Sequence, residues 1–191
     1  TQLQTLNQKV STEAQNLTKA LTSQSKTQGN WGELVLERVL ELAGLAKGRE
    51  YELQVAAKTA DGGQRFLDAL VRLPDGRQII IDAKVSLNAY LRSTSATDEA
   101  TRSNALNEHV AALREHIKTL SSKDYAKLEG ITSLNFVLMF VPNEAGFVEA
   151  LRHDAALFTD AFAKNVVLVS PTTLLPTLRA VESSWRAEAQ S

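Results

Sequence analysis

The sequence Pro-Asp-Gly at positions 74–76 separates two apolar segments, residues 65–73 and 78–83. These residues suit a three-residue hairpin connection, in which a type I turn is followed by glycine in the left-handed conformation. Such a connection fixes the register, because each residue of one strand then faces one defined residue of the other. With this turn Asp68 is predicted to face Asp82 directly across the hairpin.

Three ionisable side chains are predicted to converge at the end of this hairpin. Side chains alternate along a strand, so Asp82 and Lys84 share a face, and the register brings Asp68 to the same place. Two carboxylates whose Cβ atoms lie about 5 Å apart repel each other unless one is protonated or a cation lies between them. Since hard oxygen ligands select Mg²⁺ or Mn²⁺, the pattern predicts a metal site at Asp68 and Asp82.

A metal ion at this place would polarise a phosphoryl oxygen and lower the pKa of a bound water. Lys84 would orient that water or stabilise the charge that builds on the phosphate. The predicted chemistry is therefore phosphodiester hydrolysis. Two alternatives remain open. Asp-x-Lys is a short pattern that also occurs on solvated strand faces, and a two-residue turn at Asp75 and Gly76 would put Asp68 and Asp82 on opposite faces.

The remaining hydrophobic pattern from residue 29 onward predicts a domain of alternating helices and strands. A helix follows Gly29 and ends near Gly44, and Pro171 suits the start of a last amphipathic helix. Between them we expect strands at 51–55, 65–73, 78–83, 135–141 and 166–169, helices at 87–93 and 98–120, and a helical stretch before the last strand. The predicted class is α/β, over residues 29–191.

Residues 1–28 form a separate helical segment in this prediction. Leu3, Val10 and Leu17 recur every seven residues in a stretch without glycine, proline or aromatic residues up to residue 28. Two interpretations are open: a solvated helical leader, and a coiled coil that joins copies of the chain into a homo-oligomer.

The composition indicates in which compartment the protein works and how it could bind nucleic acid. The chain has 191 residues, of which 43% are hydrophobic, and it has no cysteine. We therefore expect one domain, with or without an extension, in the cytoplasm, where disulfides are not needed. The longest apolar run, 136–141, is too short to cross a membrane. Because the formal net charge is −1, any DNA binding must use a local patch or a metal-assisted site.

A local basic patch is predicted on the hairpin, where Arg65, Arg72, Arg77 and Lys84 gather. Arg65 and Arg72 are the expected contacts with a DNA backbone. Gln54 lies on the polar side of the first strand and is expected to reach the site or a phosphate. Plain solvent exposure is the alternative for all three. His109 and His116 are assigned to surface or interface positions and His153 to a solvated helix position, so no histidine enters the predicted site.

The sequence also resembles the RmuC family. The motifs that carry this resemblance are Gly29-Asn30-Trp31-Gly32-Glu33, Leu73-Pro74-Asp75-Gly76-Arg77, Ile81-Asp82-Ala83-Lys84-Val85-Ser86-Leu87 with Tyr90, Phe140-Val141-Pro142-Asn143-Glu144, and Ser170-Pro171-Thr172-Thr173-Leu174 with Trp185. They cover nearly everything from Gly29 onward.

The resemblance implies a DNA recombination protein with a restriction-endonuclease-like core of the PD-(D/E)xK type, a mixed sheet flanked by helices. Asp68 would match the first acid, Asp82 the second and Lys84 the lysine. Glu33 would match the acid that the first helix supplies, a role that only the resemblance gives it. Leu67 stands where the motif name has proline, which leaves the acid in place. The resemblance also implies a longer protein with a coiled coil before this domain.

The leading hypothesis is a DNA endonuclease or exonuclease that uses Mg²⁺ or Mn²⁺ held by Asp68 and Asp82, assisted by Glu33 and Lys84. The first rival is a non-catalytic DNA-binding or scaffolding module on the same fold. The second is a protein-interaction domain with no DNA role, which the mildly acidic composition favours.

Overall fold

The structure is a computed structural model and describes residues 1–21, 28–123 and 125–190. Its α-helices are α1 (Gln2–Leu21), α2 (Gln28–Leu42), α3 (Asn88–Thr94), α4 (Glu99–Ser122), α5 (Glu144–His153), α6 (Leu157–Ala163) and α7 (Pro171–Gln190), and a short 3-10 helix, η1, spans Tyr125–Lys127. Its strands are β1 (Tyr51–Lys58), β2 (Gln64–Arg72), β3 (Gln78–Asp82), β4 (Ser133–Phe140) and β5 (Val166–Val169). Each predicted strand and helix of residues 29–191 is present, with ends shifted by a few residues.

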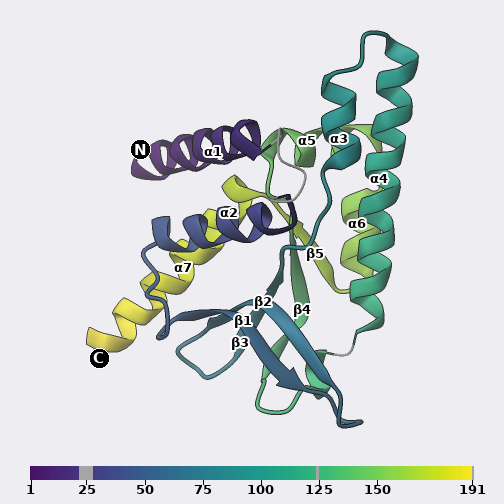
Figure 1. Cartoon of the computed structure of the whole chain (residues 1–191). Helices are drawn as coiled ribbons and strands as arrows, with labels where there is room; N and C mark the ends of the chain where they lie inside the picture. The colour runs from purple at the N-terminus through teal and green to yellow at the C-terminus, as the bar shows by residue number, and fades with distance from the viewer. Residues whose placement is uncertain (22–27, 124, 191) are drawn as a thin grey trace.

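The strands form one mixed sheet in the order β1-β2-β3-β4-β5. β1, β2 and β3 run antiparallel through two hairpins, whereas β3, β4 and β5 run parallel. Parallel neighbours need crossover connections, which α3 and α4 supply before β4, and α5 and α6 supply before β5. Figure 1 shows α1, α2 and α7 on one side of the sheet and α4 and α6 on the other. The predicted α/β class with a mixed, helix-flanked sheet is confirmed.

The turn between β2 and β3 is the predicted three-residue connection. The backbone N–H of Leu73 donates to the carbonyl of Arg77 at 2.8 Å, and Gly76 has φ +90°. Only glycine adopts this left-handed conformation readily. Because Ala69 pairs with Ile81, the next positions along the two strands are Asp68 and Asp82. The register shift that a two-residue turn would cause is therefore excluded.

The centre of the sheet is buried on both faces. Ile79, Ile80 and Ile81 of β3 are all at most 4% exposed, and Asp68 and Asp82 are only 2% and 4% exposed. Apolar side chains from helices on both sides fill this core, among them Leu36 and Leu113. The hairpin therefore does not present a solvated polar face, and its two aspartates lie within the protein.

Helix α1 packs against α2 and α7 (Figure 1). Val10 is 2% exposed, and Arg38 of α2 forms an ion pair with Glu13 at 2.7 Å. Residues 22–27, at the end of the predicted leader, lie outside the described residues. Pairing of this helix with a second copy stays a prediction. Within the described part of the chain, no helix combines the length and apolar character needed to cross a membrane.

Candidate active site

Asp68, Asp82 and Lys84 meet where β3 ends. The Lys84 ammonium nitrogen lies 2.7 Å from Oδ1 of Asp68 and 3.6 Å from Oδ2 of Asp82. The other carboxylate oxygen of Asp68 accepts a hydrogen bond from the backbone N–H of Ala83 at 2.8 Å. The structure therefore brings together the three side chains that the hairpin register places side by side.

The Lys84 ammonium is the cation that separates the two carboxylates in this structure. Burial lowers the pKa of Lys84, but its hydrogen bond to Asp68 and the negative charges of Asp82 and Asp68 raise that pKa above its usual value overall. Lys84 therefore stays protonated at neutral pH. Its charge offsets the repulsion between Asp68 and Asp82 that the sequence analysis identified.

His116 is a fourth member of the site and was missed by the sequence analysis. Its Nε2 lies 2.6 Å from Oδ1 of Asp82. Burial raises the pKa of Asp82, but the hydrogen bond and charge of His116, together with the charge of Lys84, hold that pKa below its usual value. The prediction that no histidine enters the site is wrong.

A signal for His116 was present in the pattern of α4. Leu113, Ile117 and Leu120 form the buried side of this helix, and His109 and His116 fall beside them at helical spacing. A histidine at the edge of an apolar stripe faces the domain rather than solvent. The pattern alone does not say which strand lies opposite, so it does not identify Asp82 as the partner.

Glu33 of α2 lies at the edge of the same site. Burial raises the pKa of the Glu33 carboxyl and the charge of Asp68 raises it further, whereas a hydrogen bond with Gln54 and the charge of Lys84 lower it. The net effect is a raised pKa. These effects indicate that the Glu33 carboxyl lies close to both Asp68 and Lys84. The family resemblance implies the same position.

Gln54 stands next to Asp68 across the β1–β2 ladder. The neighbouring pairs are Leu53 with Ala69 and Val55 with Leu67, so Gln54 and Asp68 occupy opposite positions. Gln54 also has φ +52°, a left-handed conformation that is unusual for a residue other than glycine. Its side chain reaches Glu33, which agrees with the expectation that Gln54 reaches the site.

The two arginines predicted to bind DNA have different surroundings. Arg72 forms an ion pair with Glu52 at 2.6 Å, and it lies four residues from Asp68 along β2, about 13 Å away. The structure does not bring Arg72 to the site. The Arg65 guanidinium lies 5.9 Å from the centre of the Tyr125 ring, and its Nη1 is buried without a hydrogen-bond partner among the described residues. A role for either arginine in DNA binding stays a prediction.

The donor atoms at this site suit a hard divalent cation. Carboxylate oxygens are the ligands that Mg²⁺ and Mn²⁺ prefer, and Mg²⁺ is often held by only two carboxylates, with water filling the rest of its shell. Within the described residues, no group of three or more His, Cys, Asp or Glu side chains is arranged as a metal site. Asp68 and Asp82 would therefore supply two ligands, and Glu33 at the edge of the site would reach the ion through water.

The other two histidines lie away from this site. His109 is fully buried, and its Nε2 lies 2.9 Å from the carbonyl oxygen of Gly146. Burial lowers the pKa of His109, and the hydrogen bond to Gly146 opposes this only in part. The expectation of a surface or interface position for His109 is therefore wrong. His153 is exposed at the end of α5, as predicted.

The two C-terminal motifs join the ends of β4 and β5. Asn143 caps α5 by accepting a hydrogen bond from the Gly146 N–H at 2.8 Å. Glu144 accepts hydrogen bonds from the hydroxyl groups of Ser170 and Thr172 at 2.9 and 2.7 Å. These contacts hold the starts of α5 and α7 together, so the residues of both motifs have a structural role.

The fold and this site define a mixed α/β protein in which an exposed lysine contacts two buried aspartates beside a helical glutamate. The RmuC family model matches residues 1–191, and the chain belongs to the RmuC family.

The chain is similar to several named proteins of this family. It is 58% identical over 189 residues to the DNA recombination protein RmuC homolog of Pseudomonas aeruginosa, a match that covers 99% of this chain and 42% of that protein. It is 54% identical over 194 residues to the homolog of Neisseria meningitidis and 50% identical over 189 residues to the DNA recombination protein RmuC of Escherichia coli, matches that cover 99% of this chain and 33% and 40% of those proteins. The chain therefore spans less than half the length of these relatives. No solved structure matches it.

Proposed function

We propose that this chain is the DNA-processing domain of a DNA recombination protein, and that it hydrolyses phosphodiesters with Mg²⁺ or Mn²⁺. The names of its relatives support the role in DNA recombination. The observation that carries the nuclease activity is the contact of Lys84 with two buried aspartates, 2.7 Å from Asp68 and 3.6 Å from Asp82.

The fold supports a restriction-endonuclease-like core of the PD-(D/E)xK type. An antiparallel hairpin carries both aspartates and the lysine, two parallel strands continue the sheet, and the first helix of the domain carries Glu33. Asp68, Asp82 and Lys84 therefore lie together where β3 ends, and Glu33 of α2 lies beside them.

Each side chain has a distinct chemical role in this proposal. When bound, the metal ion polarises the phosphate and lowers the pKa of a water molecule. Asp68 and Asp82 would supply the carboxylate oxygens that hold the ion, and His116 keeps Asp82 in place through the 2.6 Å contact. Lys84, whose raised pKa keeps it protonated, donates to a phosphate oxygen and stabilises the negative charge of the transition state.

Glu33 is the proton acceptor in this scheme. Its pKa is raised by burial and by Asp68, which brings it closer to neutral pH. A general base works best when its pKa is near the working pH. Glu33 is also only half-buried, so water reaches it.

A second candidate function is a non-catalytic DNA-binding module. One observation favours it: the negative charges of the two aspartates already have partners without a metal ion. Lys84 contacts both aspartates, and His116 contacts Asp82. In such a module Lys84 would bind phosphate, and no bond would be cleaved.

Cleavage of labelled single-stranded, duplex and branched DNA with Mg²⁺, with Mn²⁺ or with EDTA separates the two candidates. Asp82→Asn keeps the shape of the side chain but removes the charge that a divalent ion needs, so cleavage should fall at least about 100-fold. Asp75→Asn is the matched control, because Asp75 lies in the exposed turn and its ion pair there is with Arg77.

Metal-dependent cleavage by the wild type and by Asp75→Asn, but not by Asp82→Asn, supports the nuclease. Salt-dependent DNA binding without cleavage by any of the three supports the module. The absence of DNA binding would overturn both and favour a protein-interaction domain.

A further inference from the structure

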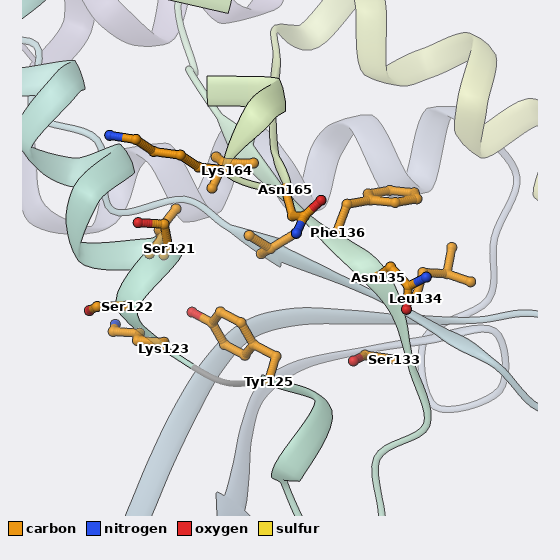
Figure 2. Close-up of a pocket in the computed structure, with 13 residues that line it drawn as sticks. Ser121, Ser122, Lys123, Tyr125, Ser133, Leu134, Asn135, Phe136, Lys164 and Asn165 are labelled. Atoms are coloured by element: carbon orange, nitrogen blue, oxygen red, sulfur yellow. The ribbon is translucent and has the colours of Figure 1, made fainter. Parts of the chain in front are cut away.

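A cavity of about 610 Å³ opens where the end of α4 and η1 meet the amino ends of β4 and β5. Figure 2 shows Tyr125 and Phe136 together with Lys123, Lys164 and Asn165 around it. This volume lies within the range of cavities that bind small organic groups. None of these residues belongs to the aspartate–lysine site.

The lining of this cavity is basic and aromatic. It contains Lys123 and Lys164, and none of the lining residues that the structure describes is acidic. Within the described parts of the chain neither lysine forms an ion pair. Phe136 is 36% exposed as a residue, so apolar surface is open beside the two charges. The cavity therefore suits a ligand that is flat and apolar in one part and anionic in another.

Arg65, which is not one of the lining residues, places a third positive charge next to Tyr125. Its guanidinium lies 5.9 Å from the centre of the Tyr125 ring, and its buried Nη1 has no hydrogen-bond partner among the described residues. Single-strand binding sites combine positive charge along the backbone with aromatic rings on which bases stack, and arginine adds a cation–π contribution. The positive charge of Arg65 therefore lies beside the Tyr125 ring.

The cavity continues the proposed nuclease site along α4. His116 contacts Asp82, and Leu120, one turn further along the helix, lines the cavity, about 6 Å along the axis. Burial raises the pKa of Tyr125, and the charges of Asp82 and Asp68 raise it further. The aspartates are therefore close enough to act on this phenol, which stays neutral and keeps an uncharged ring.

We infer that this cavity binds a nucleotide of single-stranded DNA, with the base against Tyr125 and Phe136. The adjoining phosphates meet Lys123 and Lys164. A base in a duplex is already stacked on both faces, so only an unpaired base reaches these rings. This inference rests on the proposed function, because it names the form of DNA that the neighbouring site receives.

Binding of a fluorescent oligonucleotide of about 12 nucleotides, within the length range that single-strand sites occupy, tests the aromatic contact. The measurement uses the full chain with EDTA, so that no strand is cut, and a duplex of the same length is measured in parallel. Tyr125→Leu should weaken single-strand binding about 5- to 100-fold, because stacking on the ring is lost. Tyr125→Phe keeps the ring and should bind like the wild type, and the duplex affinity should not change with either variant.

Lys164 provides a second variant that does not disturb the core, because its side chain is exposed. Lys164→Gln should lower the slope of log K against log salt by about 0.7 for a single strand, the value for one phosphate contact. Lys9→Gln makes the same change of charge on an exposed position of α1 and should leave the slope unaltered.

The inference is overturned if Tyr125→Leu and Lys164→Gln both bind the single strand like the wild type. It is also overturned if a free mononucleotide competes as well as the oligonucleotide, or if duplex binding falls equally. If Tyr125→Leu weakens single-strand binding while the wild type cleaves no DNA, the single-strand site stands and the nuclease is rejected. If the wild type cleaves duplex DNA with a metal ion and Tyr125→Leu binds the single strand like the wild type, the nuclease stands and the single-strand site is rejected.

Discussion

The Nε2 atom of His116 lies 2.6 Å from Oδ1 of Asp82, although the two residues are 34 positions apart in the chain. This contact joins α4 to the end of β3, where the candidate site lies. It also directs one Asp82 oxygen toward the helix. His116 is therefore a positioning residue for the proposed metal ligand.

Replacing His116 by leucine should destabilise the protein by about 1.5 to 3 kcal/mol, the usual loss when a buried carboxylate loses a hydrogen bond. His116→Gln can still donate to Asp82 and should lose less. Urea unfolding at neutral pH measures both. His153→Leu, on an exposed position, should change the free energy of unfolding by less than about 0.5 kcal/mol. Equal losses for His116→Gln and His116→Leu would show that the hydrogen bond is not what matters.

Lys84→Met should destabilise the metal-free protein by about 1 to 3 kcal/mol, because Asp68 is buried and loses its only cationic partner among the described residues. Added Mg²⁺ or Mn²⁺ should stabilise this variant more than the wild type, since the ion replaces the missing charge. Thermal unfolding with and without the metal measures this difference. The control Lys47→Met breaks an exposed ion pair with Glu37 and should lose less than about 1 kcal/mol. A metal effect of equal size on all three proteins would contradict the proposed ion site.

His109 should make the stability of the fold depend on pH. Burial lowers its pKa in the folded state, so below about pH 6.5, the usual value for histidine, the unfolded chain binds a proton that the folded chain does not. The free energy of unfolding should therefore fall as the pH drops below this value, and the contribution should be complete above it. Urea unfolding at a series of pH values measures this slope.

The variant that tests this assignment is His109→Gln, whose amide still donates to the Gly146 carbonyl but does not titrate. Its stability should depend less on pH between about 7 and 5 than that of the wild type. His153→Gln should keep the wild-type slope, because His153 is exposed. An unchanged slope in His109→Gln would mean that another group titrates.

Val10→Ala tests whether α1 is part of the domain. Val10 is part of the core and only 2% exposed, so removing two methyl groups should lower the free energy of unfolding by about 2 kcal/mol. Leu3→Ala removes a larger side chain from a position that is 41% exposed and should have a smaller effect. The loss should be the same at low and high protein concentration. A loss that appears only at high concentration would instead favour a coiled coil between copies.

The β2–β3 hairpin was predictable because its information is local. Gly76 sets the turn, the turn sets the register, and the register puts Asp68 beside Asp82. Lys84 was predictable too, because side chains two residues apart along a strand point to the same face, which puts Lys84 on the face of Asp82. The role of Glu33 came from the family resemblance, since its own helix pattern shows only a row of glutamates.

The sequence by itself determined the order of helices and strands, the hairpin register and the three residues that converge on it, because turn chemistry and side-chain alternation act between near neighbours in the chain. Only the tertiary structure decided that His116 contacts Asp82, that His109 is buried, and that Tyr125, Phe136 and Lys164 line one cavity. These residues belong to elements that are far apart in sequence. Their meeting depends on how α4 packs against the parallel strands, and that packing is set by the shape of the whole apolar core rather than by any short pattern.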